Sequence, residues 1–193
     1  MPISAHEQFM VELINRTRLD PQAEADRIGV ELSDGLAARR ITARAYQPLA
    51  VNAQLADASE DHSRWMLRNE SVSHRGANGS NAGDRIENAG YDLTGNSTWS
   101  ENVAFRASSR QINAEEAILR HHESLFESAL HRLNLFKPNV REVGVGQAIG
   151  DYSGYNASLV TQNFAASGSD VFITGVVYRD RDGDRFYSVG EGR

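Results

Sequence analysis

The sequence predicts an α+β fold in which several helices cover one sheet. Up to about residue 136 the apolar side chains recur mostly at helical spacing, whereas between residues 142 and 165 they alternate with polar ones. Helices that come first and strands that come late are typical of helices packed on an antiparallel sheet. With 193 residues, the chain is of ordinary size for one domain and can bury a sizeable core.

The helices are predicted from their apolar stripes and from the residues at their ends. A first helix, 6–18, ends at Asp20, because a residue before proline is disfavoured in the α conformation. Pro21 can open a second short helix that ends near Ile28, and residues 29–48 predict an irregular connection. Asn52 is expected to cap the next helix. The remaining helical segments are 52–69, 84–89 and 114–130.

The strands are predicted from alternation. Residues 142–149 and 157–165 alternate and indicate an antiparallel hairpin whose turn lies at 151–154. A break of small residues follows at 166–169, and the segment VFITGVVY (171–178) then predicts a further strand.

Composition excludes several classes of function. A formal net charge of −6 argues against nucleic acid or an anionic membrane as the main partner, and no apolar run has the length of a transmembrane segment. The first residues lack the pattern of a secretory signal peptide. The chain has no cysteine, which excludes disulfides, thiol nucleophiles and cysteine metal sites. A cytoplasmic protein and an exported one without an N-terminal signal both remain possible.

His74 and Glu101 lie outside any regular amphipathic pattern, and His131 follows at the end of the next helix-like segment. These three polar residues are expected to meet in one cleft. Two imidazoles and a carboxylate can bind Zn²⁺ or another divalent cation, or act as a general base and its orienting partner. Their separations match no short metal motif, so the alternative remains that the histidines only hydrogen-bond loop backbone. His62, on the inner face of its helix, is predicted to be a hydrogen-bonded core histidine.

Seven short motifs occur in an informative order between residues 5 and 166. They are 62–66 (HSRWM), 73–79 (SHRGANG), 89–91 (AGY), 100–104 (SENVA), 128–135 (SALHRLNL), 143–146 (VGVG) and 160–165 (VTQNFA). In this order they resemble the CAP superfamily, which comprises cysteine-rich secretory proteins, insect antigen 5 and plant pathogenesis-related proteins. The chain is most similar to the cysteine-free bacterial branch.

The resemblance implies a three-layer α-β-α sandwich, here a CAP domain over residues 1–168, with a cleft lined by two histidines and two acids. His74 and His131 match the histidines and Glu101 the first acid, whereas Ser128 takes the place of the second acid. His122 or Glu123, one or two turns earlier, is expected to compensate. The expected cleft metal ligands are therefore His74, Glu101, His131 and His122. Arg132 is expected to tie loops together.

A second candidate site lies at the C-terminal end of the sequence. Asp180, Asp182, Asp184 and Glu191 occupy positions 1, 3, 5 and 12 of a loop with the spacing of an EF-hand, which binds Ca²⁺. The backbone carbonyl of Phe186 and the side chain of Ser188 would complete the ligands. Position 6 is Arg185 in place of the usual glycine, and the alternative is a solvated acidic turn.

Together with VFITGVVY, this loop resembles the start of the B-type calcium-binding modules of bacterial surface proteins. Residues 169–193 are therefore predicted to be a linker plus the truncated start of such a module, a short C-terminal β-extension of the main domain. Because calcium is abundant outside cells, the loop favours an extracellular, secreted bacterial protein that is exported without an N-terminal signal peptide.

The resemblance favours a binding or interaction module for a small apolar ligand, a lipid or a peptide, in which any metal is auxiliary and no residue is catalytic. One alternative is a metal-assisted, peptidase-like hydrolase in which His74 or His131 is the general base and Glu101 orients it. Such an enzyme would need metal-activated water, because the sequence has neither Gly-x-Ser-x-Gly nor a thiol. The other alternative is a structural adhesin domain.

Overall fold

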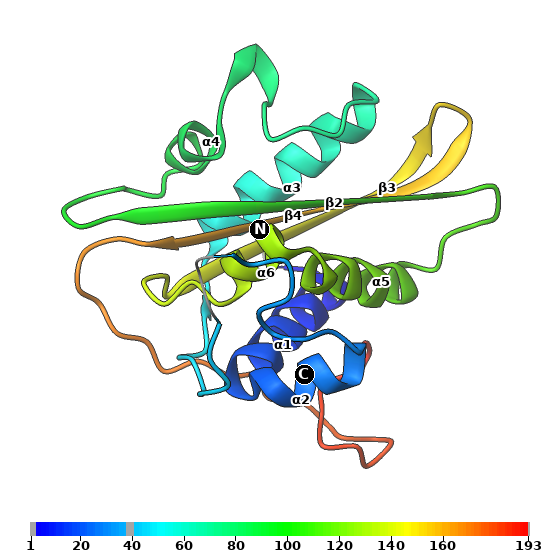
Figure 1. Cartoon of the computed structure of the whole chain (residues 1–193). Helices are drawn as coiled ribbons and strands as arrows, with labels where there is room; N and C mark the ends of the chain where they lie inside the picture. Colours follow the sequence, from blue (N-terminus) through cyan, green and yellow to red (C-terminus); the bar gives the residue numbers. More distant parts are fainter. Residues whose placement is uncertain (1–2, 38–40, 193) are drawn as a thin grey trace.

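The computed structural model describes residues 3–37 and 41–192, and its helices and strands form three layers (Figure 1). The sheet lies in the middle and helices cover both of its faces, so the predicted α-β-α sandwich is confirmed. In chain order the elements are α1 (Ala5–Leu19), α2 (Pro21–Ile28), β1 (Ala50–Val51), α3 (Ala53–Arg68), the short 3₁₀ helix η1 (Ala77–Gly79), α4 (Ala82–Asn88), β2 (Thr98–Ser108), α5 (Ala114–Glu127), α6 (Ala129–Leu135), β3 (Glu142–Tyr152) and β4 (Tyr155–Ala166).

The sheet has the strand order β1-β3-β4-β2. The predicted hairpin is confirmed as β3 and β4, which pair from Glu142↔Ala165 to Tyr152↔Tyr155. β2 runs antiparallel to β4 along its whole length and is an edge strand, while the two residues of β1 pair with β3 in parallel. The sequence patterns predicted neither β1 nor β2.

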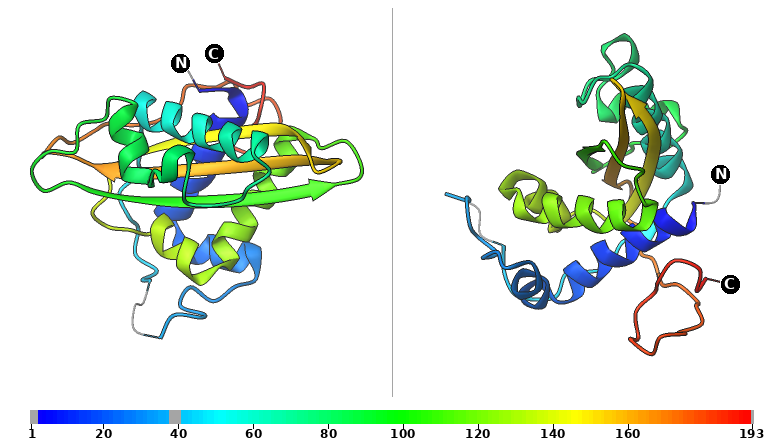
Figure 2. Two further views of the ribbon diagram at one scale, coloured as in Figure 1. Left: turned by 90° about the horizontal axis from the view of Figure 1, so that it is seen from above. Right: turned by 90° about the vertical axis from the view of Figure 1, so that its right-hand side faces the viewer.

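The helices divide between the two faces of the sheet. α3 and α4 cover one face, and α1, α5 and α6 cover the other, as the right-hand view of Figure 2 shows. α3 can lie directly on β3 because that strand carries glycine where the helix crosses it: a Cβ on Gly146 would fall 2.1 Å from the backbone nitrogen of Glu60. The Ser63 hydroxyl donates to the carbonyl of the same glycine at 2.8 Å.

The segment predicted as one helix over 114–130 is two helices. α5 ends at Glu127 and α6 begins at Ala129, because Ser128 has an extended backbone conformation (φ −74°, ψ 116°). The buried guanidinium of Arg132 stabilises the break by donating to the carbonyls of Phe126 and Glu127, two of the carbonyls that a helix end leaves without an intrahelical partner. Arg132 also donates to the Leu32 carbonyl at 3.0 Å, which confirms that it ties loops together.

The C-terminal segment differs from the prediction. Residues 171–178 do not form a strand; within the described ranges their only ladder contact is the isolated bridge between Tyr178 and Gly192. Val176 and Tyr178 pack against the main core, whereas Ile173 and Val177 are exposed. The alternation is therefore explained by packing one side of an extended chain on the domain, without a neighbouring strand to pair with it.

The same segment is anchored on α1. Tyr187 is only 3% exposed and belongs to the main hydrophobic core, and its hydroxyl donates to the Ala5 carbonyl at 3.4 Å. The Phe186 ring lies 6.1 Å from that of Phe9 and under the Arg16 guanidinium. Residues 169–192 thus pack on the domain, and a separate module there stays a prediction. No helix in the described ranges has both the length and the apolar character needed to cross a bilayer.

Candidate functional site

His74 and Glu101 lie together, although 27 residues separate them in the sequence. Glu101 lies on β2 in register with Asn163 of β4, and its side chain is only 3% exposed. His74 lies in the loop between α3 and η1, and its Nδ1 donates to Oε1 of Glu101 at 2.8 Å. This hydrogen bond raises the pKa of His74, although partial burial acts in the opposite direction. The pair is an imidazole oriented by a carboxylate.

A second cation, Arg85, holds the other oxygen of Glu101. Its Nη2 donates to Oε2 at 2.5 Å, and its Nη1 donates to the backbone carbonyls of Ser80 at 2.9 Å and His74 at 3.2 Å. Arg85 reaches this position because Asn81 caps α4 and so fixes the direction of the short helix. Arg85 is not among the predicted site residues, since nothing in its spacing indicates a partner on a distant strand.

His131 lies on α6, which is tied to β2 by asparagines. The side chain of Asn134 donates to the Glu101 carbonyl at 3.1 Å, and that of Asn102 donates to the His131 carbonyl at 3.2 Å. Burial, and then the charge of His74, lower the pKa of His131. His131 is therefore close enough to His74 for the charge of His74 to affect its pKa. The His131 ring makes no hydrogen bond within the described residues.

His122 does not join these residues, and the expectation that it supplies the fourth position is wrong. The inner face of α5 is turned towards α1 and α2, so Nε2 of His122 lies 2.9 Å from Oε1 of Glu24 and 3.3 Å from the Thr17 hydroxyl. Burial acts to raise the pKa of Glu24, but hydrogen bonds from His122 and Arg16 lower it to about 2. This network is structural.

Glu123 and Ser128, the other residues considered for the position of the second acid, do not join His74 and Glu101 either. Glu123 pairs with Arg120 at 2.9 Å on the exposed side of α5, and Ser128 forms the break between α5 and α6.

His74, Glu101 and His131 are the residues that would hold a divalent cation in the cleft. Two imidazoles and a carboxylate are suitable ligand types for zinc. However, both oxygens of Glu101 already accept hydrogen bonds, one of them from the Arg85 guanidinium. Among the described residues, His74, Glu101 and His131 do not form a group whose possible metal-ligand atoms all lie within 4.8 Å of one another. Asp180, Asp182 and Asp184 in the C-terminal loop do form such a group. The residues around Glu101 therefore do not fit a tight zinc site.

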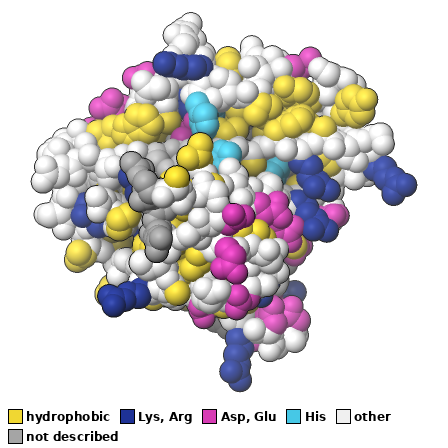
Figure 3. Space-filling view, viewed as in Figure 1, with side chains coloured by type: hydrophobic (Ala, Val, Ile, Leu, Met, Phe, Trp, Pro, Cys, Tyr) yellow, Lys and Arg dark blue, Asp and Glu magenta, His cyan; other side chains and the backbone are white. Residues whose placement is uncertain are grey.

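Apolar side chains flank the histidines on the same face of the molecule. Trp99 and Phe105 lie two residues before and four residues after Glu101 on β2 and are 40% and 39% exposed, and Leu130 on α6 is 74% exposed. Figure 3 shows histidine side chains in the middle of this face with hydrophobic side chains on both sides. We call Trp99, His74, Glu101, Phe105, His131 and Leu130 the β2 strip.

The acidic loop folds as a tight turn around Asp180. Its carboxylate accepts from the backbone nitrogens of Gly183 at 2.7 Å and Arg185 at 3.2 Å. Arg185, at position 6, has φ 62°, which is the left-handed conformation that favours glycine. The turn that glycine usually makes at this position therefore forms with arginine. It brings carboxylate oxygens of Asp180, Asp182 and Asp184 within 4.8 Å of one another.

The other three expected calcium ligands have different surroundings. Both oxygens of Glu191 accept from backbone nitrogens, that of Arg181 at 2.7 Å and that of Ser188 at 2.9 Å, so this buried carboxylate closes the loop. Phe186 donates its backbone N–H to Asp184 at 2.7 Å, while its ring packs on α1.

A family model and one solved structure agree with this fold. A family model described as the cysteine-rich secretory protein family (CAP) matches residues 11–164. The solved structure of BmVAL-1 superposes with a TM-score of 0.55 at 14% identity, covering 89% of this chain and 80% of that one. A crystal structure of NaASP2 with Zn²⁺ has a TM-score of 0.48 at 10% identity, covering 82% of this chain and 76% of the other.

One similar structure is bacterial and extracellular. It is an extracellular protein from Bacillus anthracis that contains an SCP domain, with 25% identity and a TM-score of 0.46. The alignment covers 62% of this chain and only 34% of that protein, so the chain spans about a third of its length. An outer surface protein of Borrelia burgdorferi matches at 15% identity, with a TM-score of 0.42, over 79% of this chain and 96% of that one. A search of the curated proteins finds no match.

Proposed function

Because the chain belongs to the cysteine-rich secretory protein (CAP) family, we propose that it is an extracellular bacterial binding module whose β2 strip takes a small apolar molecule, a lipid or a peptide. The observation that carries this proposal is the exposure of Trp99, Phe105 and Leu130 around a polar centre. Apolar contact area with a few fixed polar groups is the usual composition of a ligand site. At about 3.3 Å per residue, Trp99 and Phe105 lie about 20 Å apart along β2, which suits an elongated ligand.

The two tryptophans of the chain give a direct test, since Trp99 lies in the β2 strip and Trp65 lies on α3. Their indole N–H signals are followed by NMR during titration with laurate, as the lipid probe, and with an acetylated tri-leucine amide, as the peptide probe. We expect one of the probes to shift the Trp99 signal saturably. The Phe105→Ser/Leu130→Ser variant, which keeps Trp99 as the reporter, should weaken binding at least about tenfold, because two apolar side chains lose contact with the ligand.

Ile149→Ser is the matched control, because Ile149 is also an exposed apolar residue (43%) of the sheet but lies near the β3–β4 turn. It should leave the affinity unchanged. If neither probe moves Trp99, or if Ile149→Ser weakens binding as much as the double variant, the β2 strip is not the binding surface.

A metal-assisted hydrolase is the second candidate, and one observation favours it. Nδ1 of His74 is held by Glu101 at 2.8 Å, which is the geometry of an imidazole base with an orienting carboxylate. Two features oppose it: the raised pKa of His74 keeps more of the imidazole protonated, and Arg85 neutralises the carboxylate. Peptide hydrolysis above the blank that His74→Ala abolishes would favour the enzyme over the binding module.

We also propose that residues 180–191 bind Ca²⁺. The proposal is supported by the convergence of Asp180, Asp182 and Asp184 and by the left-handed Arg185 at the position that needs that conformation. Ca²⁺ is expected to raise the thermal unfolding temperature of the wild type, and Asp182→Ala should abolish that shift. Asp170→Ala, which removes an exposed acid outside the loop, is the control. An equal shift in Asp182→Ala would place the bound calcium elsewhere.

A further inference from the structure

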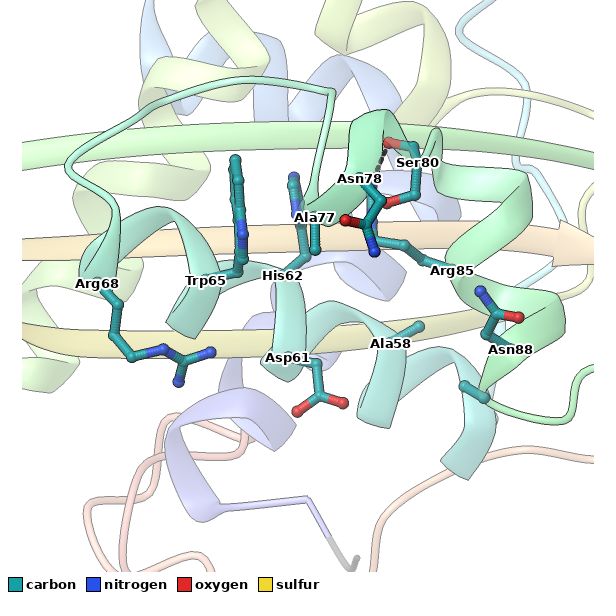
Figure 4. Close-up of a pocket in the computed structure, with 11 residues that line it drawn as sticks. Ala58, Asp61, His62, Trp65, Arg68, Ala77, Asn78, Ser80, Arg85 and Asn88 are labelled. Atoms are coloured by element: carbon teal, nitrogen blue, oxygen red, sulfur yellow. Dashed lines mark hydrogen bonds between the residues drawn. The ribbon is translucent and has the colours of Figure 1, made fainter.

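A cavity of about 460 Å³ lies behind the His74 loop, between α3 and the segment that carries η1 and α4 (Figure 4). Among its lining residues are His62 and Trp65 from α3, Asn78 and Ser80 from the loop, and Arg85 and Asn88 from α4. Figure 4 shows the side chains of His62 and Trp65 side by side on α3, with Arg85 reaching towards them from α4. A volume of this size falls in the range of small-molecule sites.

The floor of this cavity holds a buried hydrogen-bond acceptor without a partner. His62 is 1% exposed, and its Nε2 lies 2.8 Å from the carbonyl oxygen of Ser73, which can only accept. Nε2 therefore carries the proton, and burial lowers the pKa of the ring, so His62 is neutral and Nδ1 presents a lone pair. Within the described chain, Nδ1 has no hydrogen-bond partner.

The same floor holds a buried donor without a partner. The Nη atoms of Arg85 donate hydrogen bonds to Glu101 and to the carbonyls of His74 and Ser80. Its Nε–H is buried and has no hydrogen-bond partner among the described residues. Arg85 is 10% exposed. A buried polar group that lacks its hydrogen bond is destabilising, so such groups call for an explanation.

Gly76 brings these groups to one place. A Cβ on residue 76 would lie 3.3 Å from Nδ1 of His62, 3.2 Å from Nη1 of Arg85 and 2.9 Å from the Ser80 hydroxyl. The backbone of Gly76 has φ −108°, which any residue can adopt, so the glycine is not required by the local conformation. A side chain at residue 76 would crowd all three groups, so the glycine allows an acceptor, a cation and a hydroxyl to converge there.

The walls and rim of the cavity are aromatic and polar without a dominant charge. The Trp65 ring stacks on His62 with a centroid distance of 5.9 Å and an interplanar angle of 9°. Asn78 and Asn88 are exposed amides, and Asp61 and Arg68 contribute charges of opposite sign. These features suit a neutral ligand that has an apolar face for the indole and polar groups for the amides.

We propose that this cavity binds a neutral polyhydroxyl ligand, namely a single sugar ring. A group that bonds Nδ1 of His62 must donate to it, and a group that bonds Nε–H of Arg85 must accept from it. A hydroxyl does both, whereas a carboxylate only accepts and an ammonium only donates. The Trp65 indole then covers one face of the ring. This site is independent of the proposed function of the β2 strip.

The test uses Trp65 as the reporter and Trp99 as the internal reference. ¹⁵N-labelled protein is titrated with methyl β-D-glucopyranoside, methyl β-D-galactopyranoside and N-acetyl-D-glucosamine, and separately with sodium acetate and inorganic phosphate. We expect at least one sugar to shift the Trp65 indole signal saturably, with a dissociation constant of about 1 mM or below, while Trp99 stays in place. Acetate and phosphate should leave both signals unchanged.

Gly76→Ala places a methyl group against His62, Arg85 and Ser80 and, by displacing these groups, should weaken sugar binding at least about tenfold. Gly175→Ala is the matched control, because a Cβ at that position meets nothing within 4 Å. If Gly76→Ala does not fold, Asn88→Ala serves as the second variant. The proposal is overturned if no sugar moves Trp65, if acetate or phosphate moves it more strongly, or if Gly76→Ala and Asn88→Ala both bind as the wild type does. A shift of Trp99 alone would place the sugar in the β2 strip and would also overturn it.

Discussion

Replacing Arg85 by methionine tests how the charge of Glu101 is held. The two side chains are 10% and 3% exposed, so the substitution leaves a buried carboxylate without its guanidinium. Breaking a buried ion pair costs about 3–5 kcal/mol, and because protonated His74 still contacts Glu101 we expect about 3 kcal/mol near pH 6. For a chain of this size that corresponds to a fall of about 6–12 °C in the thermal unfolding temperature, measured by circular dichroism.

The same variant should show a stability deficit that grows with pH. The raised pKa of His74 means that its protonated pair with Glu101 stabilises the fold below the unfolded pKa of about 6.5 and is lost as pH rises through the folded value. Arg85 acts to lower the pKa of His74, so in Arg85→Met the pKa should rise. Above it Glu101 has no cationic neighbour left, and denaturant unfolding at pH 9 should show a larger loss than at pH 6.

Arg75→Met is the matched control, because Arg75 lies in the same loop but donates to the Gly79 carbonyl and leaves Glu101 untouched. It should change stability by less than about 1 kcal/mol at either pH. Zinc affinity, measured by calorimetry, should rise in Arg85→Met, since one oxygen of Glu101 becomes available. A deficit that is the same at both pH values, or a lower pKa of His74 by NMR, would refute the assignment of Arg85 as the counter-charge.

Two further predictions concern the fold. Gly146→Ala should destabilise by about 3 kcal/mol or more in denaturant unfolding, because its Cβ would meet the backbone of α3, whereas Gly150→Ala, whose Cβ meets only the flexible end of Leu67, should cost less. An equal loss in both would contradict the close contact of α3 with β3. Burial lowers the pKa of His121 to about 4, so stability should fall by about 3 kcal/mol as the pH drops from about 6.5 to 4, and His121→Gln should flatten that dependence in acid unfolding curves.

The helices were predictable because their signals are local. The caps and stops at Asn52 and Pro21 act within one turn of the residues that they control, and the structure has them as predicted. β2 was not predictable from alternation: in TWSENVAFRAS, polar residues occur on both sides of the strand, because Glu101 faces His74 and Asn102 faces α6. Glu101 interrupts the apolar face that Trp99, Val103 and Phe105 would otherwise show, so the alternation is hidden at the site residue.

The site was predictable only in part, because its contacts join residues that are far apart in the sequence. His74 and Glu101 could be matched to family motifs, and the structure pairs them. The expectation for His122 failed because helical spacing shows that a residue faces inward but does not show which layer it faces. The role of Arg85 could not be predicted from the sequence, since its partners lie on a strand and a loop that only the tertiary fold brings together.

Arg85 also connects the two proposed binding regions. One edge of its guanidinium holds Glu101, which orients His74 in the β2 strip, and its Nε–H lies at the floor of the cavity behind the loop. Since Nη1 donates to the carbonyls of His74 and Ser80, this one side chain fixes the loop that separates the two regions. A ligand that draws Nε–H into a hydrogen bond therefore contacts the side chain that holds the His74 backbone and acts to lower the pKa of His74 against the larger effect of Glu101. Arg85 is therefore shared by the two regions, as a donor to Glu101 in one and as a lining residue of the other.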